Sequence, residues 1–325
     1  MTKVSIIPCV GEDSLFSKAY NGFYILTPEK KIFLGNKKDR ECRFCGKNSK
    51  ETTFKMKAHI MPEFMGNKKY FSYFECDNCN QYFGQLEDSL FNFAGIFNTL
   101  STIRGKKGFP KFKTKTSDFQ AKEFGTIVQK NHDPENEDAF VYDEENERMN
   151  INVTMPSYVP HDVYKSLVKI ALCMLPDDEF SEYSNTVNWL MSENSTQHKN
   201  NPFFNVFRKI GGNPTMFPEP IAVLLRKKIC KNTHKMPYYT LLLSYGIISY
   251  QIFIPFNNYD NHLANEEDII FPIEERVVNK IYLDNKLSEL GVDMVSLSSI
   301  EKKKNEKHKA SVGFKITEDF RQNNI

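Results

Sequence analysis

The sequence predicts an α+β protein, in which a small module containing four cysteines is followed by an α+β C-terminal domain. Three observations predict this class. Runs of apolar and aromatic residues typical of strands occur at 22–26 and 151–155. By contrast, 161–176 has apolar residues at helical spacing. The uncharged run 238–256 contains Ser, Gly and Gln, which favours two buried strands turning near 244–246 over a membrane helix.

The chain is long enough for two ordinary domains, and its pattern divides it into five segments. The strand-like runs 22–26 and 32–35 are joined by a polar turn, and they predict a hairpin. The acidic run 132–148 predicts a solvated loop or hairpin tip near a domain boundary. The segments are an N-terminal strand hairpin (1–40), the cysteine-containing module (41–100), a basic segment with an acidic connector (101–150), an α+β C-terminal domain of unknown role (151–300) and a charged tail (301–325).

Two further helices are predicted in the C-terminal domain, at 179–192 and 274–289. In the tail, residues 301–310 alternate lysines with acids and polar residues. Short charge runs mostly face water, so we expect a solvated loop or disordered arm here, with nucleic-acid binding as the less favoured alternative.

The overall charge excludes a wholly cationic surface. The chain has 43 Lys and Arg against 41 Asp and Glu, a formal net charge of +2. Affinity for phosphates would therefore have to come from local clusters. The first residues carry one Lys and a short apolar run ended by Pro8, which does not resemble an export signal. We expect a cytoplasmic protein without a membrane partner.

The seven cysteines do not resemble a secreted disulfide framework. Cys9, Cys173 and Cys230 are scattered among apolar residues, where a lone cysteine usually acts as a small core residue. The other four form two Cys-x-x-Cys pairs. Two such pairs supply four soft thiolates, the closed tetrahedral set of a structural Zn²⁺. The expected zinc ligands are Cys42, Cys45, Cys76 and Cys79.

The residues around the second pair carry further information. Between the pairs lies Lys-Ala-His-Ile-Met-Pro-Glu, residues 57–63, and Asn80 follows the last cysteine directly. This arrangement resembles the HNH (ββα-metal) endonuclease family over about residues 41–95. The resemblance implies a zinc-stabilised treble-clef module, with a His-Ile-x-Pro strand end between the two Cys-x-x-Cys pairs and a helix that begins at Asn80.

The same resemblance implies roles for two residues. His59 would be the general base, and Asn80 would be a ligand of a second, catalytic metal ion, Mg²⁺ or Mn²⁺. The chemistry agrees, because phosphodiester hydrolysis needs an activated water and a cation beside the phosphate, and neutral imidazole accepts a proton near physiological pH. The alternative is a hydrogen-bonded structural histidine.

Two positions depart from the family pattern. Many members carry Asp just before the histidine as a partner metal ligand, but this chain has Ala58, which cannot bind metal. The family's middle Asn is also missing, since Phe71 occupies its position, and the displaced Asn67 is an alternative that could simply serve the turn at Gly66. Replacement carboxylates for the metal are Glu63, Glu75, Glu87 and Asp88, each of which could equally be an ordinary surface acid.

A basic stretch follows the predicted nuclease helix. Residues 104–115 contain six basic residues and no acid, with Phe109 and Phe112 among them. We expect phosphate contacts here, and a solvated hairpin is the alternative. The candidate nucleic-acid-binding residues are Arg104, Lys106, Lys107, Lys111 and Lys113.

These observations predict a metal-dependent endonuclease that hydrolyses phosphodiester bonds in nucleic acid, with DNA favoured over RNA. Nuclease modules of this kind, fused to an unrelated domain, resemble restriction and antiphage-defence effectors. The alternative is a non-catalytic zinc-ribbon module that binds nucleic acid or another protein, and Ala58 is the feature that favours it. The sequence leaves homodimerisation open.

Overall fold

The structure is a computed structural model. It describes residues 3–9, 15–26, 30–105, 108–122, 126–132, 140–193, 201–211, 217–230, 233–266, 268–274 and 293–313. Within this part of the chain, no helix has both the length and the apolar character needed to cross a membrane.

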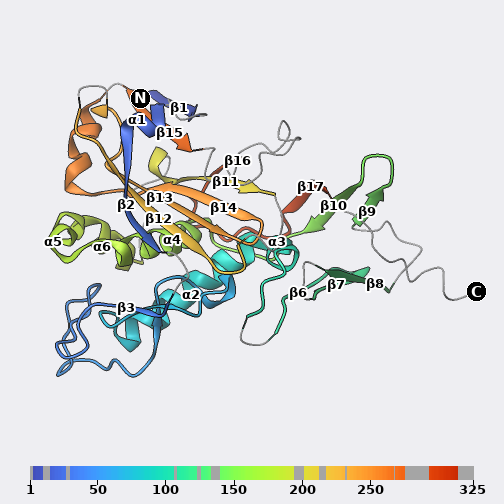
Figure 1. Ribbon diagram of the computed structural model, residues 1–325, viewed down its shortest axis with the longest axis horizontal. Helices are drawn as coiled ribbons and strands as arrows, with labels where there is room; N and C mark the ends of the chain where they lie inside the picture. The colour runs from blue at the N-terminus through green and yellow to red at the C-terminus, as the bar shows by residue number, and fades with distance from the viewer. Residues whose placement is uncertain are drawn as a thin grey trace, which may run out of the picture.

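A six-stranded sheet forms the centre of the structure (Figure 1). All neighbouring strands in it are antiparallel. Its two central strands are buried along almost their whole length, because other layers cover both faces of the sheet. In order across the sheet, the strands are β16 (Asp293–Ser296), β11 (Asn205–Ile210), β14 (Ile248–Phe253), β13 (Tyr239–Tyr245), β12 (Ile221–Lys227) and β2 (Tyr20–Leu26).

The hairpin predicted within 238–256 is confirmed as β13 and β14. Its turn contains Gly246, whose φ of +52° favours glycine. A Cβ atom at this position would also lie 2.2 Å from Cβ of Ser101, and Ser101 Oγ accepts a hydrogen bond from the amide of Ile247. The tip of the central hairpin therefore packs closely against the segment that follows the cysteine-containing module.

The predicted N-terminal hairpin is wrong. The strand at 22–26 is part of β2, which pairs with β12 at the edge of the large sheet. The following strand, β3 (Ile32–Leu34), instead pairs in parallel with β5 (Tyr70–Ser72) in a separate three-stranded sheet that is completed by β4 (Ala58–His59). Local sequence indicates that each segment is extended, but the unpaired edges elsewhere in the chain decide which partner each strand takes.

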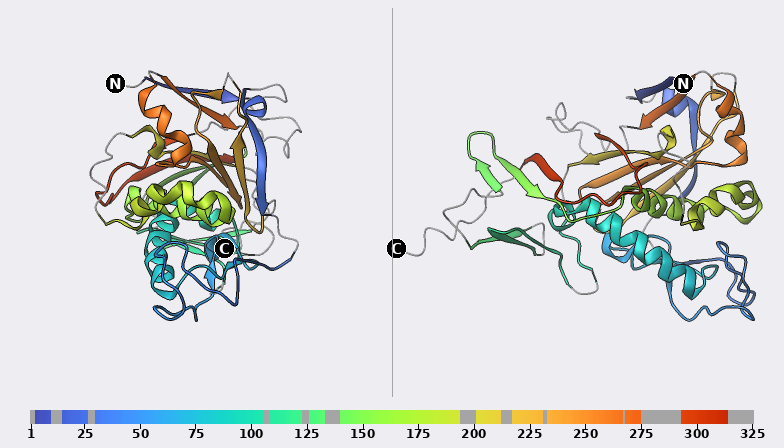
Figure 2. Two further views of the ribbon diagram at one scale, coloured as in Figure 1. Left: turned by 90° about the vertical axis from the view of Figure 1, so that its left-hand side faces the viewer. Right: turned by 180° about the vertical axis from the view of Figure 1, so that it is seen from behind.

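Helix α4 (Pro160–Met174) lies between the large sheet and helix α2 (Figures 1 and 2). It confirms the helix predicted at 161–176, and Pro160 occupies its first turn. Nearly all of its side chains are buried, including those of Lys165 and Lys169. A helix covered on both sides must bury residues of its polar face as well.

The other predicted helices have mixed outcomes. The segment 179–192 is divided into α5 (Asp177–Phe180), the 3-10 turn η3 (Ser181–Tyr183) and α6 (Ser184–Met191). The helix predicted at 274–289 falls, apart from Glu274, outside the described residues. Glu274 itself ends the strand β15 (Asp268–Glu274), which pairs in parallel with β1 (Lys3–Cys9).

The cysteine-containing module is built on α2 (Asp77–Ala94), which is followed by the short helix α3 (Ile96–Leu100). Helix α2 packs along α4, and a 3-10 turn, η1 (Glu63–Met65), lies between β4 and β5. One hydrophobic cluster runs without a break from Phe44 and Phe83 of the module through Leu167 of α4 to Leu241 of the large sheet. A second cluster, which includes Phe16, covers the other face of that sheet with helix α1 (Leu15–Ala19) and strand β15. The predicted boundary between module and C-terminal domain is therefore crossed by a continuous core.

Two small sheets extend from this body (Figure 1). One contains β10 (Arg148–Thr154), which includes most of the predicted strand 151–155, between β9 (Phe140–Asp143) and β17 (Lys307–Gly313). Strand β17 corrects part of the expectation of a loop or disordered arm at 301–310, because the backbone pairs with β10 from Lys307 onward. The other small sheet contains β6 (Lys111–Lys113), β7 (Ser117–Ala121) and β8 (Ile127–Asn131).

Candidate functional site

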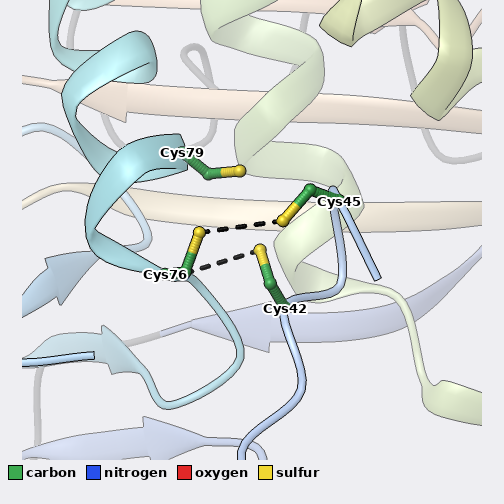
Figure 3. A group of neighbouring side chains, drawn as sticks. All are labelled: Cys42, Cys45, Cys76 and Cys79. Atoms are coloured by element: carbon green, nitrogen blue, oxygen red, sulfur yellow. Dashed lines mark hydrogen bonds between the residues drawn. The ribbon is translucent and has the colours of Figure 1, made fainter. Parts of the chain in front are cut away.

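The two Cys-x-x-Cys pairs meet at the start of α2 (Figure 3). Cys42 and Cys45 come from a loop whose tight turn places Gly46 at a φ of +68°, and the amide of Gly46 donates to the carbonyl oxygen of Cys42 at 2.8 Å. Cys76 caps the N-terminus of α2, and Cys79 lies in its first turn. Three of the four side chains are buried, and Cys45 is exposed.

The spacing of the sulfur atoms fits a zinc ion. Four sulfur atoms at the corners of a tetrahedron lie ~3.8 Å apart when each is ~2.3 Å from a central Zn²⁺. The Sγ atoms of Cys45 and Cys76 are 3.8 Å apart, and all four Sγ atoms lie within 4.8 Å of one another. The cluster thus has the donor set and the spacing of a structural zinc site.

At Cys42, the surroundings favour the thiolate form that metal binding requires. A hydrogen bond from the thiol of Cys79 lowers the pKa of Cys42 to about 5, against the opposing effect of burial. The backbone amide of Cys76, 3.5 Å from Sγ of Cys42, acts in the same direction. The pKa of Cys79 is raised, because its proton is held in the bond to Cys42.

Of the remaining cysteines, Cys173 is buried as predicted for a small core residue, whereas Cys230 is exposed, contrary to that prediction. Strand β1 ends at Cys9, but the surroundings of the Cys9 side chain are outside the described part of the structure.

His59 ends the two-residue strand β4, and its side chain is half-buried. Its backbone is paired with Phe71, and the two rings meet edge to face with centroids 4.8 Å apart. The carbonyl oxygen of His59 accepts a hydrogen bond of 2.6 Å from Nζ of Lys169. Ala58, where many family members have an acid, is buried, and Phe71 supplies a ring rather than an amide. Both departures seen in the sequence therefore have apolar packing roles.

Asn80 lies in the first turn of α2, one residue after Cys79, and is half-buried. Its Nδ2 is 3.7 Å from the sulfur of Met56, in the loop that leads to β4. The neighbouring Asp77 fixes this loop, since its carboxylate accepts hydrogen bonds from the amides of Lys55 and Met56 at 3.1 and 2.7 Å. These bonds and that of Thr53 Oγ1 lower the pKa of Asp77, although the slight burial of its carboxyl acts to raise it.

The four candidate carboxylates differ in their surroundings. Glu75 and Glu87 both face the ammonium of Lys169, at 3.2 and 3.7 Å. Glu63 is half-buried in η1, and Asp88 is exposed on α2. Among the described residues, none of the four joins His59 in a second cluster of three or more His, Cys, Asp or Glu side chains close enough to hold an ion.

Asn67 has a clearer role than the sequence indicated. It is buried, and its amide closes the loop between β4 and β5 through four hydrogen bonds to backbone atoms. Nδ2 donates to the carbonyl oxygens of Met61 and Tyr70, and Oδ1 accepts from the amides of Lys69 and Tyr70, at distances of 2.7 to 3.1 Å. The turn role considered for Asn67 is confirmed, and through it the loop directly after His59 is held in one conformation.

The described residues of the basic stretch lie beyond the end of α2 that is opposite the cysteines (Figures 1 and 2). Eighteen helical residues separate the two ends, which is ~27 Å at 1.5 Å per residue. Lys111 and Lys113 are exposed on β6, while the aromatic Phe112 between them is buried. The guanidinium of Arg104 lies over the ring of Phe109. The predicted contacts at Lys106 and Lys107 fall outside the described residues.

The contact of Lys169 with this region was not predicted from the sequence. The residue belongs to the C-terminal part of the chain, yet its ammonium binds three groups of the cysteine-containing module. The available signal was its position within the broad apolar face of the predicted helix 161–176, where a lysine must either reach water or find acceptors.

A family model described as HNH endonuclease matches residues 42–93. The matched segment contains both cysteine pairs, His59, Asn80 and almost all of α2, and it confirms the resemblance of this segment to that family. Comparison with curated proteins and with solved structures returns no significant match.

Proposed function

We propose that this chain is a metal-dependent endonuclease that hydrolyses phosphodiester bonds, with DNA as the favoured substrate and His59 as the general base. The observation that carries the proposal is the match of residues 42–93 to an HNH endonuclease model, together with the place of His59 within it. The backbone around His59 is held by its pairing with Phe71, by a hydrogen bond from Asn67 to Met61 and by the hydrogen bond from Lys169. The imidazole therefore projects from a fixed backbone.

The chemistry follows from the side chains. A neutral imidazole can take a proton from water at physiological pH, which produces the nucleophile. A divalent ion, Mg²⁺ or Mn²⁺, would supply positive charge beside the scissile phosphate. Asn80 is the proposed protein ligand for that ion, because its amide lies on the first turn of α2, next to the zinc cluster.

The test is a cleavage assay on plasmid DNA and on RNA, with and without Mg²⁺ or Mn²⁺. We expect metal-dependent cutting by the wild type and a 10²- to 10⁴-fold lower rate for His59→Ala, the typical contribution of a positioned general base. His234→Ala is the matched control, since His234 is an exposed histidine outside the module. His59→Ala should keep its zinc and its affinity for nucleic acid.

A second candidate, a zinc-ribbon module that binds nucleic acid without cutting it, is favoured by one observation. Ala58 fills with a buried methyl group the place of a family metal ligand, and no second metal cluster forms among the described acids. Binding without metal-dependent cutting, with His59→Ala indistinguishable from wild type, would establish this second function.

A role in restriction or antiphage defence rests on the resemblance to nuclease modules that are fused to unrelated domains. It is tested by expressing the wild type and His59→Ala in bacteria and counting plaques after phage infection. Protection by the wild type alone would support the role, and equal plaque counts would exclude it.

A further inference from the structure

The side chain of Lys169 crosses from α4 into the cysteine-containing module. It is only 2% exposed. Its Nζ lies 2.6 Å from the carbonyl oxygen of His59, 3.2 Å from Glu75 and 3.7 Å from Glu87. These three groups come from three different parts of the module: strand β4, the segment leading to Cys76, and helix α2.

A buried ammonium is stable only when acceptors replace the water it has lost. Burial acts to lower the pKa of Lys169, but the facing carboxylates outweigh it and keep the ammonium protonated. Both acids face this one cation, and the side chain of Glu75 is 0% exposed. The charge of the Lys169 ammonium therefore holds this side chain of α4 against groups of the cysteine-containing module.

The bond to His59 concerns the backbone of the proposed general base. Strand β4 has two residues, so its ladder with β5 supplies few hydrogen bonds. The hydrogen bond from Lys169 holds the peptide that follows His59, and the same ammonium faces Glu87 on α2, the helix whose first turn contains Asn80. One cation thus contacts both the strand that carries His59 and the helix that carries Asn80.

We propose that Lys169 is a positioning residue of the nuclease site, through which helix α4 of the C-terminal part completes the geometry around His59. This inference rests on the proposed function. It deepens that function, because it gives the C-terminal part a direct effect on the rate of cleavage. A displacement of about 1 Å at a reacting group can lower a rate 10²-fold, so loss of this bond should reach kcat.

The first test is kinetic and uses the full chain. Lys169→Met keeps the length of the side chain but removes its charge. In a second variant, Lys169→Met is combined with Glu75→Gln, so that fewer unpaired charges remain buried; the Glu75 side chain is fully enclosed, at 0% exposure. The control is Lys165→Met, since Lys165 is a buried lysine one turn earlier on α4 whose Nζ binds the carbonyl oxygen of Ser192.

We expect kcat to fall about 10- to 100-fold in both Lys169 variants, with KM and zinc content unchanged and no recovery at high Mg²⁺. Lys165→Met should keep the wild-type kcat. A Lys169 variant that folds, holds zinc and cuts at the wild-type rate would overturn the proposal.

The second test does not depend on activity. In protein labelled with ¹³C at histidine, the imidazole resonance of His59 is assigned by its loss in His59→Ala. Lys169→Met should shift this resonance, and Lys165→Met should leave it in place. An unchanged His59 signal in Lys169→Met would refute the positioning role. If Lys169→Met shifts the signal but the wild type cuts neither DNA nor RNA, the proposed nuclease function is excluded and the contact between Lys169 and His59 stands.

Discussion

Arg43, which lies between the first two zinc-site cysteines, donates a hydrogen bond of 2.9 Å to the carbonyl oxygen of Leu175, the residue that caps the end of α4. The same Nη1 donates to the carbonyl oxygen of Leu172, also at 2.9 Å. The last carbonyl groups of a helix have no partners within it and carry partial negative charge. The guanidinium also lies over the rings of Phe74 and Phe180. Arg43 therefore connects the loop of the first cysteine pair to the C-terminal part of the chain.

Replacing Arg43 should weaken this connection. We expect Arg43→Met to lower the free energy of unfolding by about 2–4 kcal/mol, because hydrogen bonds from a charged donor contribute roughly 1.5–3 kcal/mol each and are not fully additive. Arg43→Lys should lie between wild type and Arg43→Met, since an ammonium keeps the charge but not the planar fork. Urea denaturation measures the difference, and equal midpoints for all three proteins would contradict the proposed role of Arg43.

The zinc site predicts a metal content and a folding effect. Elemental analysis should give about one zinc per chain, because four thiolates in one closed set hold a single ion. Cys76→Ser should lose that zinc and lower the melting temperature, since metal binding of this kind is coupled to folding. Cys230→Ser is the matched control, as Cys230 is an exposed cysteine outside the cluster. If Cys76→Ser kept its full zinc content and its melting temperature, the assignment of the four cysteines as a structural zinc site would be wrong.

Asn80 should respond to metal concentration in a way that His59 does not. A weakened metal ligand lowers affinity for the ion before it removes the chemistry. Asn80→Ala should therefore cut poorly at low Mg²⁺ and recover part of its rate as Mg²⁺ is raised, while His59→Ala stays inactive throughout. The measurement is a Mg²⁺ titration of the cleavage rate for both variants. Identical titration curves for Asn80→Ala and wild type would show that Asn80 is not a ligand.

The exposed lysines of β6 make a prediction about salt. If Lys111 and Lys113 contact phosphates, changing both to Gln should weaken binding to all sequences alike and should flatten the plot of log affinity against log salt by about 0.9 per lost contact on duplex DNA. Lys302→Gln with Lys304→Gln is the control, and it also tests the alternative that the tail binds nucleic acid. An unchanged slope of log affinity against log salt for the β6 variant would show that these lysines face water and do not contact phosphates.

Asp260 gives the fold a dependence on pH that does not involve the metal site. Burial raises its pKa to about 6, although its carboxylate accepts hydrogen bonds from Asn257 and from the amide of Tyr238. Because the folded pKa lies above the ordinary value, the folded state binds the proton more tightly, and the contribution of Asp260 to stability falls as pH rises from about 4 to about 6. Relative to Asp260→Asn, the wild type should lose free energy of unfolding over that interval. A constant difference between the two proteins across it would show that the pKa of Asp260 is not raised.

Several features could be predicted because their causes are local. The two Cys-x-x-Cys pairs need only their own turns to aim sulfur atoms at one point, and Gly46 permits such a turn. The same holds for the helix that begins at the second pair and for the hairpin that turns at Gly246. The helix at 160–174 was evident from its apolar spacing, since this periodicity is set by residues three and four apart.

The partners of the extended segments could not be predicted in the same way. The strands at 20–26 and 32–34 are neighbours in sequence, and a hairpin is the simplest arrangement for such a pair. The first strand instead pairs with β12, far along the chain. The second pairs with β5, which follows the first cysteine pair. Period-two patterning shows that a segment is extended, but it does not show with which strand the segment will pair.

The sequence by itself indicated the four clustered cysteines, the resemblance of residues 42–93 to the HNH endonuclease family and the place of His59 within that segment, because these depend on residue types at short spacing. Only the tertiary structure decided that Arg43 and Lys169 join this module to α4. Both are cations whose acceptors lie more than eighty residues away along the chain. A cation shows in sequence only that it needs acceptors, whereas the packing of α2 on α4 decides which acceptors it finds.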